Sequence, residues 1–404
     1  MPVGQLPFPE MPPISGIKLN AVSAGIKKNH QLDVLMIALP SNATVAGVFT
    51  QNAFSAAPVA VCREHIKHQP SYIVVNSGNA NACTGELGMA AALDCCSAIA
   101  SHAGIKREQV LPFSTGVIGE LLPAQKIIDA LPALFDQLSE AQWSLAAQSI
   151  MTTDTCPKGA TRSFEYEGET VVVNGIAKGA GMINPNMATM LGFVATSATV
   201  SKDVLDVLSF NAANQSFNRI TIDGDTSTND SCLLMAANQT SSVVDSTSGA
   251  FYQRLEQAIN EVYTELAQMI VRDGEGATKF LSIHVEQGAT ADECLQVAYA
   301  IAHSPLVKTA CFASDPNWGR IVAAIGYAGV DALDVERLRV YLGDQLIVEN
   351  GGRASSYTEE AGQLVMDQQD ITLRVVLDRG RFSETIWTTD LSHEYVTINA
   401  EYRT

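Results

Sequence analysis

Residues 178–191 have the sequence KGAGMINPNMATML and lead directly into the apolar run LGFVATSATV. Glycine, asparagine, proline and small residues dominate the first part, which predicts a turn-rich loop before the apolar segment. The small residues before Thr189 leave room for the peptide bond after Ala188 to bend towards the Thr189 hydroxyl. If that bond breaks, Thr189 becomes an N-terminal residue with a nucleophilic hydroxyl and a free amine that can act as its base. This stretch therefore makes the chain a candidate acyl-transfer enzyme.

The length and composition of the chain indicate a large folded protein. It has 404 residues, 47% of them hydrophobic and only 17% charged, which suits two lobes better than one and argues against disorder. The formal net charge of −18 repels nucleic acid and anionic membranes, so we expect neither as a partner. That charge mildly favours cationic substrates, although solubility alone explains it better.

Cysteine, histidine and terminal patterns exclude several other classes. None of the eight cysteines forms a CxxC pair, which predicts reduced thiols rather than a disulfide framework. The histidines show neither HExxH nor HxH spacing, so we expect no metal site. The first residues, MPVGQLPFPEMPP, lack the basic and apolar regions of a signal peptide, and no apolar run is long enough to span a membrane. We therefore expect a cytoplasmic enzyme.

Hydrophobic periodicity along the chain indicates a mixed α/β protein with many hairpins. A helix with apolar residues at the 3.6-residue period is the clearest element, at 251–271. Hairpins, rather than regular βαβ units, predict sheets packed with helices on their outer faces, with a lobe boundary near residue 280. Further strands are expected at 33–38, 46–50, 72–75 and 279–288, hairpins from residue 164 and at 339–351 and 371–390, and helices at 89–103, 123–130, 139–150 and 290–303.

Two of these helix boundaries depend on single residues. A break at Leu131-Pro132 is expected to end the helix that starts near Pro123. Ser139 with Gln142 predicts a capping box for the helix that follows.

Three other polar segments could carry chemistry. Thr115-Gly116 offers a hydroxyl and an unhindered backbone N–H, the kind of donors that stabilise a developing oxyanion, although such a pair alone is more often a turn. The segments TIDGDTSTNDSC (221–232) and RDGEGATKF (272–280) are rich in carboxylates. A hard cation is conceivable at the first, but EF-hand spacing fails, so turn and cap roles are preferred for both.

Ten ordered segments, spread along nearly the whole chain, resemble the ornithine acetyltransferase family, also called glutamate N-acetyltransferase or ArgJ, of arginine biosynthesis. The segments are GVFTQNAFSAAPV (47–59), NSGNANACTG (76–85), STGVIGE (114–120), MTTDTCPK (151–158), KGAGMINPNMATML (178–191), DGDTSTND (223–230), RDGEGATKF (272–280), SPLVKTA (304–310), SDPNWGRI (314–321) and NAEYRT (399–404). No departure from the family pattern is visible in these segments.

The resemblance implies a self-cleaving acetyltransferase. The family cuts its chain before the threonine of its ATML motif, which is Thr189 here, so residues 1–188 and 189–404 would form associated α and β chains. Thr189 would take the acetyl group of N2-acetylornithine as an ester and pass it to glutamate in a ping-pong scheme. The implied fold is an α/β (α+β type) αββα-like sandwich with a second, smaller C-terminal lobe, as in ArgJ and DmpA. The implied assembly is an α2β2 heterotetramer without a cofactor.

Individual roles also come from the resemblance. Thr115 and Gly116 match the family's oxyanion-hole pair. Lys178, a point cation, suits the α-carboxylate that ornithine and glutamate derivatives share. Glu275 could approach the amine of Thr189 or an ammonium on the substrate. The family's substrate-contact positions fall on Thr152, Lys178, Thr189, Glu275, Asn399 and Thr404.

Two alternatives remain at this point. An N-terminal-nucleophile aminopeptidase or amidohydrolase would share the cleavage and the threonine but pass the acyl group to water. A non-enzymatic, uncut binding protein would lack the chemistry altogether. Some family members also use acetyl-CoA as the acetyl donor, so the resemblance leaves open whether this enzyme is mono- or bifunctional.

Overall fold

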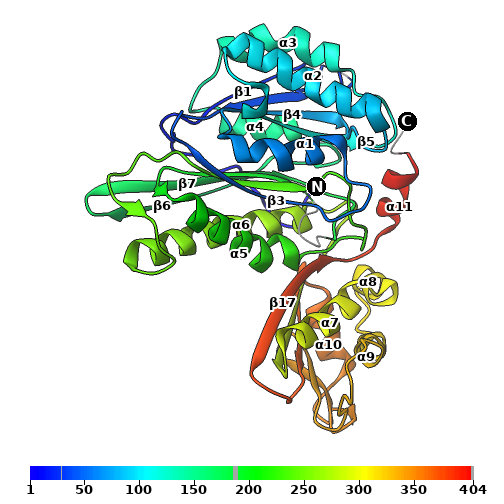
Figure 1. Ribbon diagram of the computed structural model, residues 1–404. Coiled ribbons are helices and arrows are strands. Elements are labelled where there is room, and N and C mark those ends of the chain that lie inside the picture. The colour runs from blue at the N-terminus through cyan, green and yellow to red at the C-terminus, as the bar shows by residue number, and fades with distance from the viewer. Residues whose placement is uncertain (29, 185–189, 402–404) are drawn as a thin grey trace. The chain divides into compact units, whose positions relative to one another are not determined.

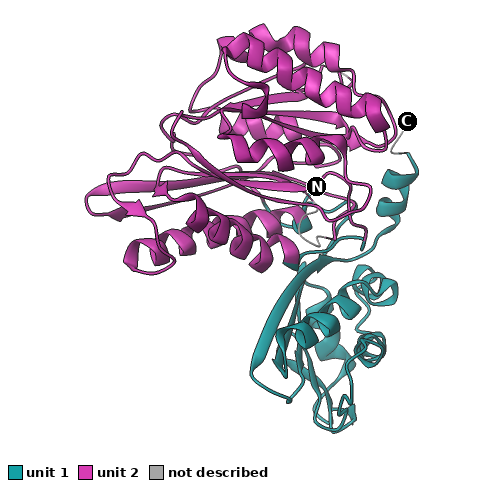
Figure 2. Ribbon diagram, viewed as in Figure 1, with its two compact units in different colours: residues 1–5, 219–224, 271–404 teal, residues 6–218, 225–270 magenta. Residues whose placement is uncertain are grey.

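The computed structural model describes residues 1–28, 30–184 and 190–401, and these divide into two compact units (Figure 2). The larger unit comprises residues 6–218 and 225–270, and the smaller one comprises residues 1–5, 219–224 and 271–404. Among the described residues, no helix combines the length and apolarity needed to cross a membrane. Ala188, Thr189 and Thr404 lie outside the described residues.

The described part of the larger unit contains two large β-sheets. The first has the strand order β1-β2-β4-β5, in which only β4 and β5 run parallel. The second has the order β3-β10-β8-β7-β6, in which only β10 and β8 run parallel. The strands are β1 (Lys18–Val22), β2 (Val34–Ala38), β3 (Thr44–Phe49), β4 (Tyr72–Asn79), β5 (Val110–Val117), β6 (Lys158–Tyr166), β7 (Glu169–Lys178), β8 (Leu191–Thr196) and β10 (Ser231–Ala236), with a small pair β9 (Thr199–Val200) and β11 (Val243–Val244).

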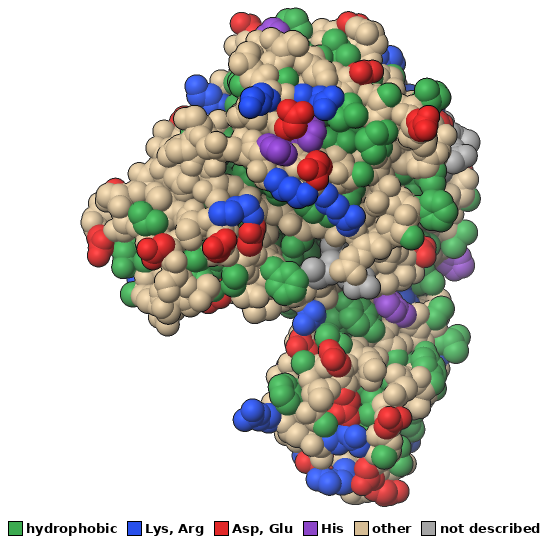
Figure 3. All heavy atoms as spheres, in the orientation of Figure 1, with side chains coloured by type: hydrophobic (Ala, Val, Ile, Leu, Met, Phe, Trp, Pro, Cys, Tyr) green, Lys and Arg blue, Asp and Glu red, His purple; other side chains and the backbone are tan. Residues whose placement is uncertain are grey.

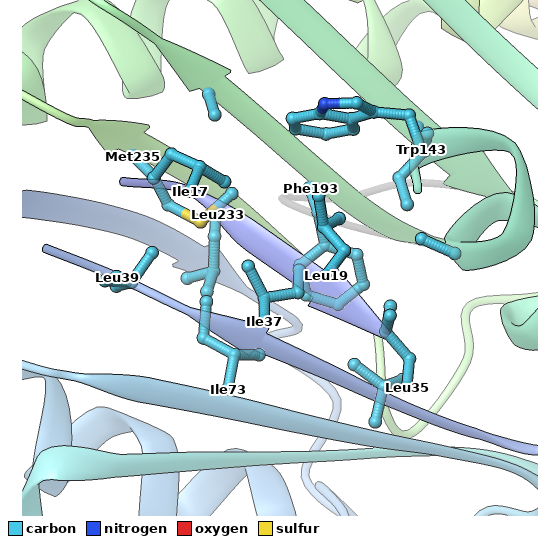
Figure 4. Close-up of a cluster of buried hydrophobic side chains, with 14 of the residues drawn as sticks. Ile17, Leu19, Leu35, Ile37, Leu39, Ile73, Trp143, Phe193, Leu233 and Met235 are labelled. Atoms are coloured by element: carbon cyan, nitrogen blue, oxygen red, sulfur yellow. The ribbon is translucent and has the colours of Figure 1, made fainter. Parts of the chain in front are cut away.

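The main core lies between these two sheets. Leu35 and Ile37 of β2 pack there with Phe193 and Leu233 of the second sheet and with Trp143 (Figure 4). The alternate residues of β2 point to the opposite face of the first sheet, where they join a second apolar cluster with the neighbouring helices. A strand buried on both faces has no polar side, which explains the continuous apolar sequence VLMIA of β2.

Helices cover the outer faces of both sheets. Helices α2 (Gly85–Ala103) and α3 (Ala124–Asp136) cover the first sheet, and α5 (Lys202–Gln215) and α6 (Ala250–Arg272) cover the second (Figure 1). Gly175 of β7 lets α6 approach closely, because a Cβ there would lie 2.7 Å from the Val262 side chain. Helix α4 (Trp143–Ile150) contributes to the core between the sheets, and α1 (Ala57–His65), η1 (Ile66–His68), η2 (Arg107–Gln109) and η3 (Phe217–Arg219) complete the list up to α6. The predicted αββα sandwich is therefore confirmed.

The smaller unit is built on a single described sheet of six strands in the order β15-β14-β13-β16-β12-β17. Its own apolar core includes Leu281, Ile283, Val297 and Leu373, so it buries hydrophobic surface independently of the larger unit. The strands are β12 (Phe280–Gly288), β13 (Arg339–Leu342), β14 (Gln345–Glu349), β15 (Gly352–Arg353), β16 (Asp370–Val376) and β17 (Phe382–Thr389), and the helices are α7 (Ala291–Ala302), α8 (Pro305–Phe312), α9 (Trp318–Gly326), α10 (Glu359–Met366) and α11 (His393–Ala400).

Three local predictions are wrong. Helix α3 continues through Pro132, because Ile127, Leu131 and Leu134 bury one face of it and this packing outweighs the lost backbone hydrogen bond. Ser139 caps no helix, since α4 begins at Trp143 and the Ser139 hydroxyl accepts from the nearby Ala141 N–H instead.

The third wrong prediction is the hairpin at 371–390. Strand β12 lies between β16 and β17, parallel to the first and antiparallel to the second. The connection over residues 377–381 is long enough to pass the roughly 10 Å that separates next-nearest strands. Both edges of β12, whose Leu281, Ile283 and Val285 lie in the core, thereby gain hydrogen-bond partners.

Candidate active site

The tip of β5 carries the predicted oxyanion-hole pair, Thr115 and Gly116. Gly116 has a φ of 131°, and a Cβ on it would lie only 2.3 Å from the carbonyl carbon of Gly78 in β4. Only glycine therefore fits at this position, where the two parallel strands approach closely. Gly116 itself has no side chain that could cover its N–H.

Lys178 ends β7, in the other sheet of the larger unit, yet it reaches the tip of β5. Its Nζ donates a hydrogen bond to Thr115 Oγ1 at 3.3 Å, and the residue is only 9% exposed. A lysine ammonium can only donate. The hydroxyl of Thr115 therefore accepts from Lys178 and retains its own proton to donate elsewhere.

Asp154 connects the segment around Thr152 with the residue that follows Lys178. Its carboxylate accepts from the Thr152 N–H at 2.9 Å, from the Gly179 N–H at 2.7 Å and from Lys158 Nζ at 2.6 Å. Burial by itself would raise the pKa of Asp154, but the cations Lys158 and Lys178 outweigh it and hold that pKa well below its usual range. A buried anion thus ties Thr152 to the end of β7.

A third lysine contributes to the same cationic environment. Burial lowers the pKa of Lys27 to about 8, with Asp33 and Asp154 opposing the shift and Lys178 adding to it. Its Nζ donates to the carbonyl oxygens of Leu32 at 2.9 Å and Ser149 at 3.3 Å. Figure 3 shows charged side chains of both signs on the surface, whereas Lys158 and Lys178 are buried. An acidic protein thus holds a buried cationic cluster suited to an anionic substrate group.

Asp230 precedes β10 and is a buried acid beside the same residues. It is 2% exposed, and its Oδ2 has no hydrogen-bond partner among the described residues. Burial raises its pKa well above the usual range and outweighs the opposing effect of Lys178. The next residue, Ser231, donates its N–H to the carbonyl of Met190 at 2.8 Å, and Met190 directly follows Thr189 in the sequence.

Glu275 and Asn399 are brought together in the smaller unit. Asn399 Nδ2 in α11 donates to Glu275 Oε2 at 2.7 Å. The adjacent Gly276 has a φ of 69°, and a Cβ there would lie 2.5 Å from Ser392 Oγ, so the chain leading to α11 packs closely on this loop. Asp390 accepts from the Thr278 N–H at 2.8 Å and holds the other end of the loop. The C-terminal segment is therefore docked as far as it is described.

Comparison with known proteins gives the family. The ArgJ family model matches residues 18–404. The chain belongs to the ArgJ family. It is 55% identical over 405 residues to the arginine biosynthesis bifunctional protein ArgJ of Pseudomonas fluorescens, covering all of both chains. It is therefore an acetyltransferase of arginine biosynthesis, as the sequence motifs predicted.

Two solved ArgJ-family structures are also similar to this chain. The ArgJ protein of Bacillus halodurans is 35% identical, with a TM-score of 0.50, over 52% of this chain and 99% of that chain. The ornithine acetyltransferase of Mycobacterium tuberculosis, solved with ornithine, is 31% identical, with a TM-score of 0.38, over 44% of this chain and 94% of that chain.

The predicted site residues of this ArgJ enzyme thus fall into separate groups. Thr115, Thr152 and Lys178 gather in the larger unit, where Lys178 bonds Thr115 and Asp154 bonds the backbone of Thr152 and Gly179; Gly116 follows Thr115 in β5. Glu275 and Asn399 form a bonded pair in the smaller unit. Ala188, Thr189 and Thr404 lie outside the described residues, so their roles stay predictions. Among the described residues, no group of three His, Cys, Asp or Glu side chains could hold a metal ion.

Sequence reasoning missed the residues that support this site. Asp154 and Lys158 occur four residues apart in MTTDTCPK, a segment that carried the family resemblance but no assigned ion pair. The segment TIDGDTSTNDSC by itself indicates only turn, cap or cation roles for its carboxylates, and Asp230 is one of them. The sequence signal for these supporting residues is an acidic or basic residue within a segment of mostly small residues.

Proposed function

We propose that this enzyme moves the acetyl group of N2-acetylornithine to glutamate through an acetyl ester on Thr189, after it cuts its own chain between Ala188 and Thr189. The observation that carries the proposal is the hydrogen bond from buried Lys178 to Thr115. This bond leaves the Thr115 hydroxyl proton for another acceptor, as an oxyanion-hole donor requires. The same ArgJ motifs carry the nucleophile and its partners.

Self-cleavage would precede the transfer reaction. The Thr189 hydroxyl attacks the carbonyl carbon of Ala188, the C–N bond breaks, and the released nitrogen becomes the free amine of Thr189. Water then hydrolyses the resulting ester, which leaves a carboxylate on Ala188 and restores the Thr189 hydroxyl.

In the transfer reaction, the amine of Thr189 takes the hydroxyl proton as the oxygen attacks the acetyl carbon of N2-acetylornithine. The hydroxyl of Thr115 and the N–H of Gly116 stabilise the oxyanion, and one such donor contributes about 3 kcal/mol to lowering the barrier. The C–N bond then breaks, and the Thr189 ammonium returns its proton to the departing ornithine amine. The amine of glutamate attacks the acetyl ester and regenerates Thr189.

The binding roles that we propose for Lys178 and Glu275 follow from the charges of their side chains. Lys178, within the cationic cluster, attracts the α-carboxylate of either amino acid. Glu275, held by Asn399 at 2.7 Å, attracts the side-chain ammonium of ornithine or the amine of Thr189. Thr152 and Thr404 complete the substrate contacts. Acetyl-CoA as a second donor, the absence of a cofactor, the cytoplasmic location and the α2β2 assembly stay predictions.

The test is to incubate the enzyme with N2-acetylornithine, with and without glutamate, and to quantify N-acetylglutamate and acetate. The proposal predicts N-acetylglutamate and ornithine in equal amounts, with little acetate. Acetate as the main product in the presence of glutamate would instead identify an amidohydrolase.

A further inference from the structure

Asn229 lies just before β10 and reaches the oxyanion segment of β5. Its Nδ2 donates to the carbonyl oxygen of Ser114 at 2.7 Å, across 115 positions of sequence, and the residue is 8% exposed. Its Oδ1 accepts from Ser227 Oγ at 2.9 Å. Because both ends of the side-chain amide are bonded, its orientation is determined.

The bond to Ser114 acts on the neighbouring residue through the peptide plane. The carbonyl of Ser114 and the N–H of Thr115 belong to one planar peptide unit, so holding the first fixes the second. Within the described part of the chain, β5 is an edge strand that pairs with β4 on one side. Asn229 therefore adds, from the segment before β10, a hydrogen bond to the backbone of this edge strand.

A second set of hydrogen bonds holds Ser114 from the side of β4. Ser114 Oγ donates to Asn76 Oδ1 at 2.6 Å, and Asn76 Nδ2 donates to the Asn79 carbonyl at 2.8 Å. All three side chains are buried. Buried amides and hydroxyls cost stability unless each is hydrogen-bonded. Apolar side chains packed at the same place would stabilise the strand equally well without this requirement. A network at this one point fits a need for accurate placement.

We propose that Asn229 is a positioning residue: by holding the Ser114–Thr115 peptide plane, it sets where the backbone of Thr115 lies and thus how the Thr115 hydroxyl points towards the oxyanion. This inference rests on the proposed function, because it assumes that Thr115 and Gly116 stabilise the tetrahedral intermediate. Asn229 does not touch the reacting atoms and acts only through Ser114.

The main test is Asn229→Asp, which keeps the shape but replaces the donor to Ser114 with a carboxylate oxygen. The rate of acetyl transfer per cleaved chain should fall about 10- to 100-fold, since a displacement of about 1 Å can cost roughly 100-fold. The matched control is Asn20→Asp, which removes a buried amide that donates to the carbonyl oxygens of Ala133 and Leu134 and makes no bond to β5; it should change the rate per cleaved chain less than about threefold. Asn229→Ala gives the same test without added charge if the Asp variant does not fold.

A change of one atom in the substrate separates positioning from a general structural role. Sulfur in place of the acetyl oxygen weakens the hydrogen bonds that the oxyanion hole makes, so the wild type should prefer N2-acetylornithine to its thioacetyl analogue. Asn229→Asp should reduce that preference, as Thr115→Ala does, and the double variant should be little worse than Thr115→Ala alone. A wild-type rate, an unchanged oxygen-to-sulfur ratio or additive losses would overturn the role of Asn229. If Thr115→Ala itself leaves the rate and the ratio unchanged, the oxyanion assignment of the proposed function fails instead.

Discussion

The ion pair between Asp154 and Lys158 gives the clearest stability prediction. Both side chains are completely buried, and the carboxylate also accepts two backbone N–H bonds. In Asp154→Asn, the Lys158 cation loses its anionic partner at a site with no solvent-exposed surface, and the new amide cannot accept at every position where the carboxylate did. Removing one partner of a buried pair costs about 3–5 kcal/mol, a large part of the roughly 5–15 kcal/mol that stabilises a typical protein.

Urea unfolding at pH 7 measures this loss directly. Asp154→Asn should lower the free energy of unfolding by about 3–5 kcal/mol, and Lys158→Met should lower it by a comparable amount because it leaves the carboxylate buried. The double variant should lose markedly less free energy of unfolding than the sum of the two single losses, since neither buried charge remains. A loss below about 1 kcal/mol in Asp154→Asn would refute the argument, as would additive losses in the double variant.

Three further predictions concern charge, substrate binding and the chain end. Burial raises the pKa of Asp230, so the carboxyl group contributes its full stability below the unfolded pKa of about 4, and this contribution is lost as the pH rises towards the pKa of the folded protein. The melting temperature of Asp230→Asn should therefore rise relative to that of the wild type between pH 4 and 8. A constant difference between the two melting temperatures would count against this. Lys178→Met should lower kcat/KM for N2-acetylornithine about 10- to 100-fold, as expected for the loss of a hydrogen bond to a charged group, whereas an unchanged value would remove Lys178 from the site. Deleting residues 399–404 removes the Asn399 bond to Glu275, so activity should fall at least about tenfold while the melting temperature changes little; full activity would refute the predicted role of the C-terminal residues.

Local sequence patterns predicted much of the fold. The 3.6-residue period of α6, the strand β12 and the hairpins β6–β7 and β13–β14 follow from contacts between near neighbours. The wrong predictions concern elements whose structure depends on contacts with residues far away in the sequence. Pro132 stays helical because α3 packs on the first sheet, and β16 pairs with β12, about 90 residues earlier in the chain, rather than with β17.

The candidate site divides in the same way. The family motifs supplied Thr115 and Lys178, but not the hydrogen bond between them, which joins residues 63 positions apart. Asn229 and Asp154 bond to backbone atoms. Every residue has these atoms, so the sequence does not indicate which residue such a side chain bonds. Such supporting residues emerge only when the strands that carry them are assembled.

Intact-mass spectrometry of the purified protein, before and after addition of N2-acetylornithine, tests the central claim most directly. The proposed function predicts two chains divided between Ala188 and Thr189, with one acetyl group added to the chain of residues 189–404 by the substrate. A single uncut mass of 43.0 kDa that does not change with substrate would contradict it.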